Sequence, residues 1–324
     1  MINPGTYPRL DQQSSRRRRT PRIMVALFAV LALGACDGGA LPTGRPDAAS
    51  FTLAGTATLA WVSPTGSVAT NPVTFRADAT SDIVTMKYFA DGTYLLGSST
   101  DRANHFPVTY KFTGVGVRRI YVRGYNAAGT QLAGAYKDFT IRDLIANVPY
   151  FFQYANTYEP GATCANTTMA MLLKYYGANY TPDQIYLEFR KQSQDEFKFD
   201  TIFNRLAARA GLKQRIRVHM ETGSVAQMEA ELNKQRPVII HGKFTSSGHV
   251  MLLIGNDGTS YTMNDPAGVW GQQLCNGAGY GGSGGAGVRY GRYIVGRAIT
   301  TPWQGNCTYF NPNTVRYHET YLVP

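Results

Sequence analysis

The run Ala162-Thr-Cys164-Ala-Asn-Thr-Thr-Met-Ala-Met-Leu-Leu-Lys-Tyr-Tyr-Gly177 decides how the C-terminal half of the chain folds. Its apolar residues recur at helical spacing, which predicts an amphipathic helix that begins at Cys164 and is ended by Gly177. The unpaired backbone N–H groups and the dipole at a helix N-terminus favour a thiolate over a thiol. The sequence therefore predicts a nucleophilic sulfur at the first turn of this helix.

A nucleophilic thiolate needs a general base and a group that orients the base. His249 begins an apolar run that ends at Gly255, which predicts a buried strand, and Asp265 ends the strand predicted next. The turn Asn256-Asp257-Gly258 makes these two strands antiparallel neighbours. We therefore expect Asp265 to lie beside His249 and to hold one imidazole nitrogen while the other faces the thiol.

Gln153 lies eleven residues before Cys164, from where its side-chain amide could stabilise an oxyanion together with the Cys164 backbone N–H. The motifs Pro149-Tyr-Phe-Phe-Gln153, the Cys164 helix ending in Tyr-Tyr-Gly, Gly248-His249-Val and Asn264-Asp265-Pro266 resemble the papain-like cysteine peptidases related to the bacteriocin-processing, double-glycine leader peptidases. The resemblance covers about residues 147–300. It implies that Gln153 supports the oxyanion hole, Cys164 is the nucleophile, His249 the general base and Asp265 its orienter. The segment Ala165-Asn166-Thr167 departs from the Gly-Pro-containing segment that is frequent in the family.

Residues 147–324 are predicted to be an α+β domain. Helix start and stop signals delimit helices over about 181–190, 199–210 and 224–235, and strands follow at 237–244 and 249–255. Helices first and antiparallel strands afterwards are typical of α+β proteins. The resemblance implies the papain-like arrangement, with the cleft between the active-site helix and the sheet.

Residues 51–143 are predicted to be an all-β sandwich. Seven short segments of β-forming residues are separated by turn signals, at 56–61, 73–77, 85–90, 93–96, 108–112, 119–125 and 136–141. The pattern resembles bacterial immunoglobulin-like domains. No cysteine pair lies in this region, His105 stands alone, and we expect a spacer or a binding module.

Residues 1–35 are predicted to be an export signal, with Arg16–Arg19 and Arg22 before the apolar run Ile23–Leu33. The ending Leu33-Gly-Ala-Cys36 resembles a bacterial lipobox, which implies cleavage before Cys36 and a lipid anchor on it. Residues 36–50 then form a tether. The alternative is an ordinary secretory signal with an incidental cysteine. The resemblance places the protein in the bacterial cell envelope, on the periplasmic or extracellular face of a membrane.

The net charge of +11 does not indicate nucleic-acid binding. Six of the 32 basic residues and one of the 21 acidic residues precede Cys36, so the mature chain has 26 minus 20, or +6. This charge is spread without a basic run.

Cys275 and Cys307 remain to pair with each other in an oxidising compartment, although either could instead pair with Cys164 and inactivate the enzyme. The segment 277–287 between them is rich in glycine. Its pairs Gly281-Gly282 and Gly284-Gly285 suggest the hypothesis that the enzyme cleaves its own chain after a double glycine. A plain flexible loop is the favoured interpretation.

The remaining histidines are interpreted as structural. His241 has apolar neighbours and no carboxylate at strand spacing, and His219 and His318 lack a partner pattern. No metal-ligand spacing and no phosphate-binding glycine loop is found, so no cofactor or metal is required.

The sequence thus predicts an exported, lipid-anchored thiol hydrolase that cleaves peptide bonds, with a peptide or a peptidoglycan stem as substrate. Two alternatives stay open: a surface protein that binds such peptides without cutting them, and an acyltransferase that uses an amine in place of water. The oligomeric state cannot be read from the sequence.

Overall fold

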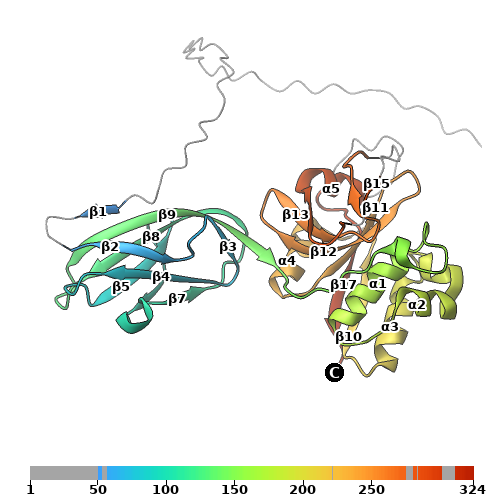
Figure 1. Ribbon diagram of the computed structural model, residues 1–324, viewed down its shortest axis with the longest axis horizontal. Coiled ribbons are helices and arrows are strands. Elements are labelled where there is room, and N and C mark those ends of the chain that lie inside the picture. Colours follow the sequence, from blue (N-terminus) through green and yellow to red (C-terminus); the bar gives the residue numbers. More distant parts are fainter. Residues whose placement is uncertain (1–49, 53–56, 221, 275–279, 283, 301–310) are drawn as a thin grey trace, which may run out of the picture. The chain divides into compact units, whose positions relative to one another are not determined.

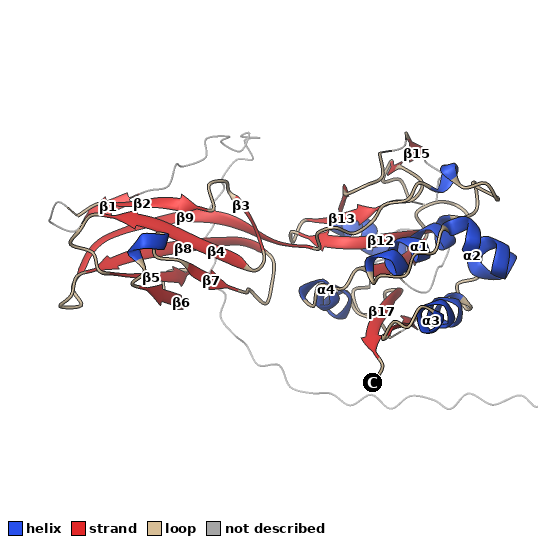
Figure 2. Cartoon of the chain, turned by 60° about the horizontal axis from the view of Figure 1, so that its bottom comes forward, coloured by secondary structure: helices blue, strands red, loops and turns tan. Residues whose placement is uncertain are grey.

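The computed structural model describes residues 50–52, 57–220, 222–274, 280–282, 284–300 and 311–324. The described residues begin with strands and one short 3₁₀ turn, and continue with mixed helices and strands (Figure 1). Within the described residues, every α-helix follows β9 (Gln131–Leu144) along the chain. Figure 2 draws α1 (Cys164–Tyr175) beside β12 (His249–Asn256) and α4 (Val225–Asn233) beside β17 (Tyr317–Leu322). No helix within these ranges is long and apolar enough to cross a membrane.

The N-terminal strands form two sheets around one core. The first sheet has the order β9 (Gln131–Leu144), β8 (Gly116–Tyr125), β5 (Thr85–Ala90), β6 (Tyr94–Ser99), and β1 (Ser50–Thr52) and β3 (Val68–Thr70) also pair with β9. The second has the order β2 (Leu59–Ser63), β4 (Val73–Ala79), β7 (Val108–Tyr110). Alternate residues of both sheets bury their side chains in the core, among them Phe75, Tyr88 and Phe139.

All seven strands predicted in this region form, with ends that differ by a few residues. The short strands β1 and β3 were not predicted, because three residues give no measurable alternation. His105 does not stand alone as expected, since its Nδ1 lies 2.6 Å from Asp78 Oδ1 on the exposed surface. The 3₁₀ turn η1 (Arg102–Asn104) precedes it.

The second part is built on an antiparallel sheet. Its order is β10 (Gln214–His219), β17 (Tyr317–Leu322), β11 (Val238–Gly242), β12 (His249–Asn256), β13 (Ser260–Asn264), β16 (Val288–Gly291). The end of β9 adds two pairs to β12, Leu144 with Gly255 and Asp143 with Asn256. A small hairpin, β14 (Val269–Trp270) and β15 (Tyr280–Gly281), follows β13.

Helices cover both faces of this sheet. Ile239 and Leu252 share a core with α1 (Cys164–Tyr175), α2 (Pro182–Phe189) and α3 (Phe199–Arg209). Their strand neighbours Ile240 and Met251 point the other way, into a core with α4 (Val225–Asn233) and α5 (Arg292–Ile299). The 3₁₀ turns η2 (Gln153–Ala155) and η3 (Arg190–Gln194) flank α1 and α2. The predicted mixture of helices and antiparallel strands is confirmed.

The helix boundaries follow the predicted capping signals. Thr181 and Ser224 each accept the backbone N–H three residues on, and Gln184 and Gln227 bond back, so both capping boxes form. The prediction of an amphipathic α1 was wrong, because all residues from Ala165 to Leu173 are buried. Since α1 packs on the sheet and on the two helices after it, even its polar Asn166, Thr167 and Thr168 lie inside.

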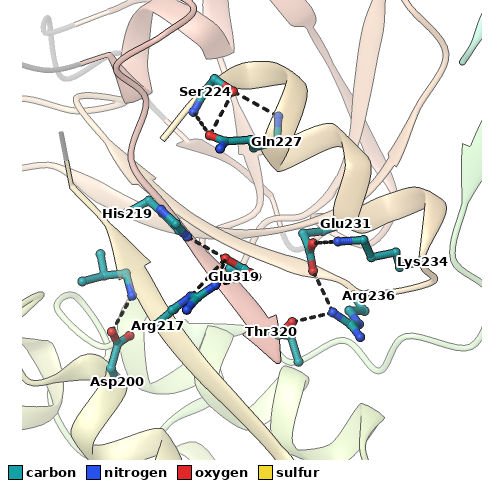
Figure 3. Close-up of polar contacts among 11 residues, drawn as sticks. Asp200, Arg217, His219, Ser224, Gln227, Glu231, Lys234, Arg236, Glu319 and Thr320 are labelled. Atoms are coloured by element: carbon teal, nitrogen blue, oxygen red, sulfur yellow. Dashed lines mark hydrogen bonds and ion pairs between the residues drawn. The ribbon is translucent and has the colours of Figure 1, made fainter. Parts of the chain in front are cut away.

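Polar side chains bind the last strand to its neighbours (Figure 3). Glu319 on β17 accepts hydrogen bonds from Arg217 and lies 2.7 Å from His219 Nε2 on β10. The buried Glu231 of α4 pairs with Lys234 and Arg236, and Arg236 donates to the Thr320 carbonyl at 2.8 Å. The C-terminal strand is therefore held on both sides by charged contacts.

Candidate active site

The chain brings Cys164, His249 and Asp265 together from three elements. Cys164 is the first residue of α1, His249 the first residue of β12, and Asp265 follows the last residue of β13. The pairing of β12 with β13 places Asn264 opposite Leu252, so the end of β13 returns beside the start of β12. This is the geometry that the turn at residues 256–258 predicted.

Asp265 is fully buried and its carboxylate accepts three hydrogen bonds. Oδ1 lies 2.8 Å from His249 Nε2 and accepts the Ala267 backbone N–H at 3.0 Å. Oδ2 accepts the Tyr290 hydroxyl at 2.8 Å. Because these donors satisfy both oxygens, the carboxylate stays at one angle to the imidazole and holds the Nε2 side of the ring.

The other side of the His249 ring is hydrogen-bonded to the Cys164 thiol. Burial raises the pKa of that thiol, but the His249 hydrogen bond and charge, together with the Val250 and Ala165 backbone N–H groups, bring it below its usual value. Burial also lowers the pKa of His249, but the charge and hydrogen bond of Asp265, with Cys164, outweigh it and raise the pKa to about 10. Both shifts favour a thiolate beside an imidazolium over two neutral groups.

Gln153 lines the same cavity and is almost fully buried. Its backbone N–H donates to the Pro266 carbonyl at 2.8 Å, and its side-chain Nε2 donates to the Pro160 carbonyl at 3.0 Å. The first contact ties the glutamine to the Asp265 turn. The second fixes the amide and leaves one Nε2 hydrogen for another acceptor.

Two tyrosines complete the site and were not predicted. Tyr290 on β16 accepts the Trp270 backbone N–H at 2.7 Å and donates to Asp265. Tyr280 on β15 packs edge-on against the His249 ring, with ring centroids 5.0 Å apart. Tyr280 lies within the glycine-rich segment and Tyr290 follows it, and no sequence pattern there indicates that the chain returns to Asp265.

Gly285 and Gly287 of this segment contact the residues of the Asp265 turn. The Gly285 carbonyl accepts the Asp265 backbone N–H at 2.8 Å, and Gly287 N–H donates to the Asn264 side chain at 3.0 Å. A Cβ on Gly285 would lie 2.0 Å from the Asp265 carbonyl oxygen, and one on Gly268 would lie 2.1 Å from the Gly282 carbonyl oxygen. The interpretation as a plain flexible loop therefore does not hold at Gly285, which needs glycine for this close contact.

The histidines interpreted as lacking carboxylate partners do have them, from distant segments. His241 Nδ1 lies 2.9 Å from Glu196, His219 Nε2 2.7 Å from Glu319, and His318 Nδ1 2.5 Å from Asp200. These pairs join residues at least 45 positions apart, which no local spacing could reveal.

A cavity of about 800 Å³ opens at Cys164 and His249. Cys164, His249, Gln153 and Tyr280 line one wall. Among the described residues, Cys164 is the free cysteine, and no group of three or more His, Cys, Asp or Glu side chains could hold a metal ion. Cys36, Cys275 and Cys307 lie outside the described residues.

The fold and the paired thiol and imidazole define a class, the cysteine-peptidase-like proteins. Residues 145–276 match the Peptidase_C39 like family. No curated protein matches the chain.

Two solved structures are similar to parts of the chain. A Bacillus anthracis protein described as a C39-like peptidase is 13% identical, with a TM-score of 0.38, covering 56% of this chain and 99% of that one. The fibronectin(III)-like modules of Clostridium thermocellum CbhA are 13% identical, with a TM-score of 0.23, covering 26% of this chain and 94% of theirs.

Proposed function

We propose that residues 147–324 form a papain-like thiol hydrolase that cleaves peptide bonds through Cys164, His249, Asp265 and Gln153. The observation on which this depends is the continuous hydrogen-bonded series from the Cys164 sulfur through His249 to Asp265, open to one cavity. The match of residues 145–276 to the Peptidase_C39 like family supports it.

Acylation begins when the Cys164 thiolate attacks the carbonyl carbon of the substrate amide. The negative charge that develops on the carbonyl oxygen is stabilised by the Cys164 backbone N–H and the second Nε2 hydrogen of Gln153. The C–N bond then breaks as the His249 imidazolium donates its proton to the departing amine. A thioester on Cys164 and neutral His249 remain.

Deacylation uses the neutral His249 as a base. It takes a proton from water, the hydroxide oxygen attacks the thioester carbon, and the C–S bond breaks to return the thiolate and the imidazolium. Asp265 keeps the ring in place through both steps. General acid–base help of this kind contributes typically about 10²–10⁴-fold to the rate.

The test is hydrolysis of a peptide library by purified protein and its variants. We expect Cys164→Ala and His249→Ala each to abolish cleavage while the thermal melting curve is retained, and Asp265→Ala to lose less activity. Cleavage by Cys164→Ala at the wild-type rate would refute the mechanism. Added amines that appear in the products would identify the acyltransferase alternative.

We further propose that this enzyme is exported and anchored by lipid on Cys36, with residues 51–143 as an immunoglobulin-like domain on the tether 36–50. The lipobox-like ending at Cys36 and the two sheets packed around one core support these assignments. A bridge between Cys275 and Cys307 is proposed for the same oxidising location. Peptide mapping without reductant tests the bridge, since a crosslinked pair of peptides is expected and a Cys164-containing pair would contradict it.

A further inference from the structure

A second wall of the catalytic cavity is built from residues that the proposed reaction does not use. Three rings lie in contact there: Phe199 at the start of α3, His241 on β11 and His318 on β17. The His318 ring centroid lies 4.9 Å from that of Phe199 and 5.1 Å from that of His241. All three residues line the cavity. They give it a floor of three rings, with the His318 ring tilted by 39° to each of the other two.

Glu196 stands at the edge of this floor with 27% of its side chain exposed. His241 Nδ1 lies 2.9 Å from Oε2, and Arg316 Nη1 lies 3.2 Å from each carboxylate oxygen. These contacts fix the direction of the carboxylate. The Arg316 side chain is 14% exposed and is not among the residues that line the cavity, so the carboxylate is the charge presented there.

Among the described residues that line the cavity there is no Lys or Arg, and Glu196 is the carboxylate. The His241 Nδ1–H bond to Glu196 is made by a neutral ring, since burial lowers the His241 pKa to about 4. Glu196 thus brings the carboxylate of the Glu196–Arg316 ion pair to a cavity whose described lining has no Lys or Arg.

We propose that this wall is a substrate subsite for a primary ammonium group on an aliphatic stem. The methylene groups of the stem pack on the rings of Phe199, His241 and His318, and the ammonium donates hydrogen bonds to the Glu196 carboxylate. Where the ammonium group passes over the face of the Phe199 ring, a cation–π attraction adds to the binding. The inference rests on the proposed function and names its substrate class: peptides with a lysine-like side chain or another free amine near the cleaved bond.

The experiment uses pairs of peptide electrophiles that alkylate the active-site thiol and differ only by lysine or norleucine at one position. The second-order rate of Cys164 labelling is measured by mass spectrometry on the purified chain. At one position we expect the lysine probe to react about 10- to 100-fold faster, the size expected for a charge-assisted hydrogen bond. Equal rates for lysine and norleucine at every position would overturn the subsite.

Glu196→Gln keeps the shape and the acceptor atom but removes the charge. It should abolish the lysine preference and leave the norleucine rate within about twofold, because no catalytic group is touched. Retention of the preference would overturn the proposal. Glu188→Gln is the matched control, since Glu188 pairs with Arg209 away from this cavity, and it should keep the full preference.

Glu196→Asp is a second variant that keeps the test informative if Glu196→Gln does not fold. Thermal melting curves of both variants show whether they fold. Glu196→Asp keeps the charge but withdraws it by one methylene, so a smaller preference for lysine is expected. An unchanged or reversed preference would count against the subsite. If the lysine and norleucine probes label Cys164 equally fast, the proposed thiolate is supported and only the subsite is refuted. If no probe labels Cys164 in the wild-type chain, the proposed thiolate fails and the subsite with it.

Discussion

At the scale of one residue, the Asp265 carboxylate is held by His249 on a neighbouring strand and by the Tyr290 hydroxyl from farther along the chain. Its proximity to His249 followed from a turn signal and strand alternation, which are local. Its contact with the Tyr290 hydroxyl could not be predicted, because it depends on β13 pairing with β16 across the glycine-rich segment. The same reason explains why the carboxylate partners of His241 and His318 were missed.

Tyr290 is expected to act as a positioning residue for Asp265. Tyr290→Phe removes one donor to a buried carboxylate and leaves the Trp270 N–H without its acceptor, which should cost about 1–3 kcal/mol in free energy of unfolding. Turnover should fall roughly 10-fold, with KM little changed, because the imidazole loses orientation. Chemical denaturation and steady-state kinetics measure the two effects. Unchanged kcat would show that Asp265 is held without this hydroxyl.

The pH dependence of peptide cleavage follows from the directions of the two pKa shifts. The Cys164 pKa is lowered and the His249 pKa is raised to about 10, so the ion pair exists between them. As pH rises through about 10, His249 loses the proton that the leaving amine needs, and kcat/KM should fall. If kcat/KM instead fell between pH 6 and pH 7, the result would contradict the raised pKa of His249 that is attributed to Asp265.

Gly285 and Gly284 form a matched pair of positions. Gly285→Ala places a Cβ 2.0 Å from the Asp265 carbonyl oxygen and 2.6 Å from the Tyr150 hydroxyl, whereas nothing lies within 4 Å of a Cβ on Gly284. We expect Gly285→Ala to lose about 1–3 kcal/mol of stability together with most activity, and Gly284→Ala to change neither by much. Thermal melts and cleavage rates of both variants decide the point. Similar behaviour of the two would show that the segment is not packed as described.

At the scale of elements, helices and strands were predicted correctly where local capping or turn residues mark their ends. The capping boxes at Thr181 and Ser224 and the turn after β12 fixed α2, α4, β12 and β13 from local chemistry. Elements whose existence depends on partners far along the chain, such as β10, β17 and α5, were missed. The full burial of α1 was missed for the same reason, since its polar side chains are covered by tertiary contacts such as Asn166 to Ser193 at 2.6 Å.

Glu231 is the element-scale test of how α4 is held (Figure 3). The residue is 3% exposed and pairs with Lys234 and Arg236. Glu231→Ala therefore removes the carboxylate partner of the Arg236 guanidinium, which lies beside β17. We expect a loss of about 1–3 kcal/mol in the free energy of unfolding, measured by urea titration. Glu188→Ala, whose ion pairs are more exposed, should cost less than about 1 kcal/mol. Equal losses would mean that burial does not govern these pairs.

At the scale of the whole molecule, the proposed lipid anchor at Cys36 has a consequence for how the chain partitions between detergent and water. If Cys36 holds a lipid, Cys36→Ser should move the chain from the detergent phase to the aqueous phase in a two-phase extraction. The reason is that acyl chains contribute roughly 0.8 kcal/mol per buried CH₂ to membrane binding. Detergent partitioning that survives the substitution would disprove the anchor at this residue.

The most direct test of the central claim is the rate at which a small thiol-directed electrophile labels Cys164 as a function of pH, mapped by mass spectrometry in wild type and His249→Ala. The account predicts fast wild-type labelling well below pH 8, where an ordinary thiol with pKa of about 8.5 reacts slowly. In His249→Ala the midpoint should move up by at least one pH unit, because the imidazolium that lowers the Cys164 pKa is gone. Identical pH profiles for the two proteins would contradict the account.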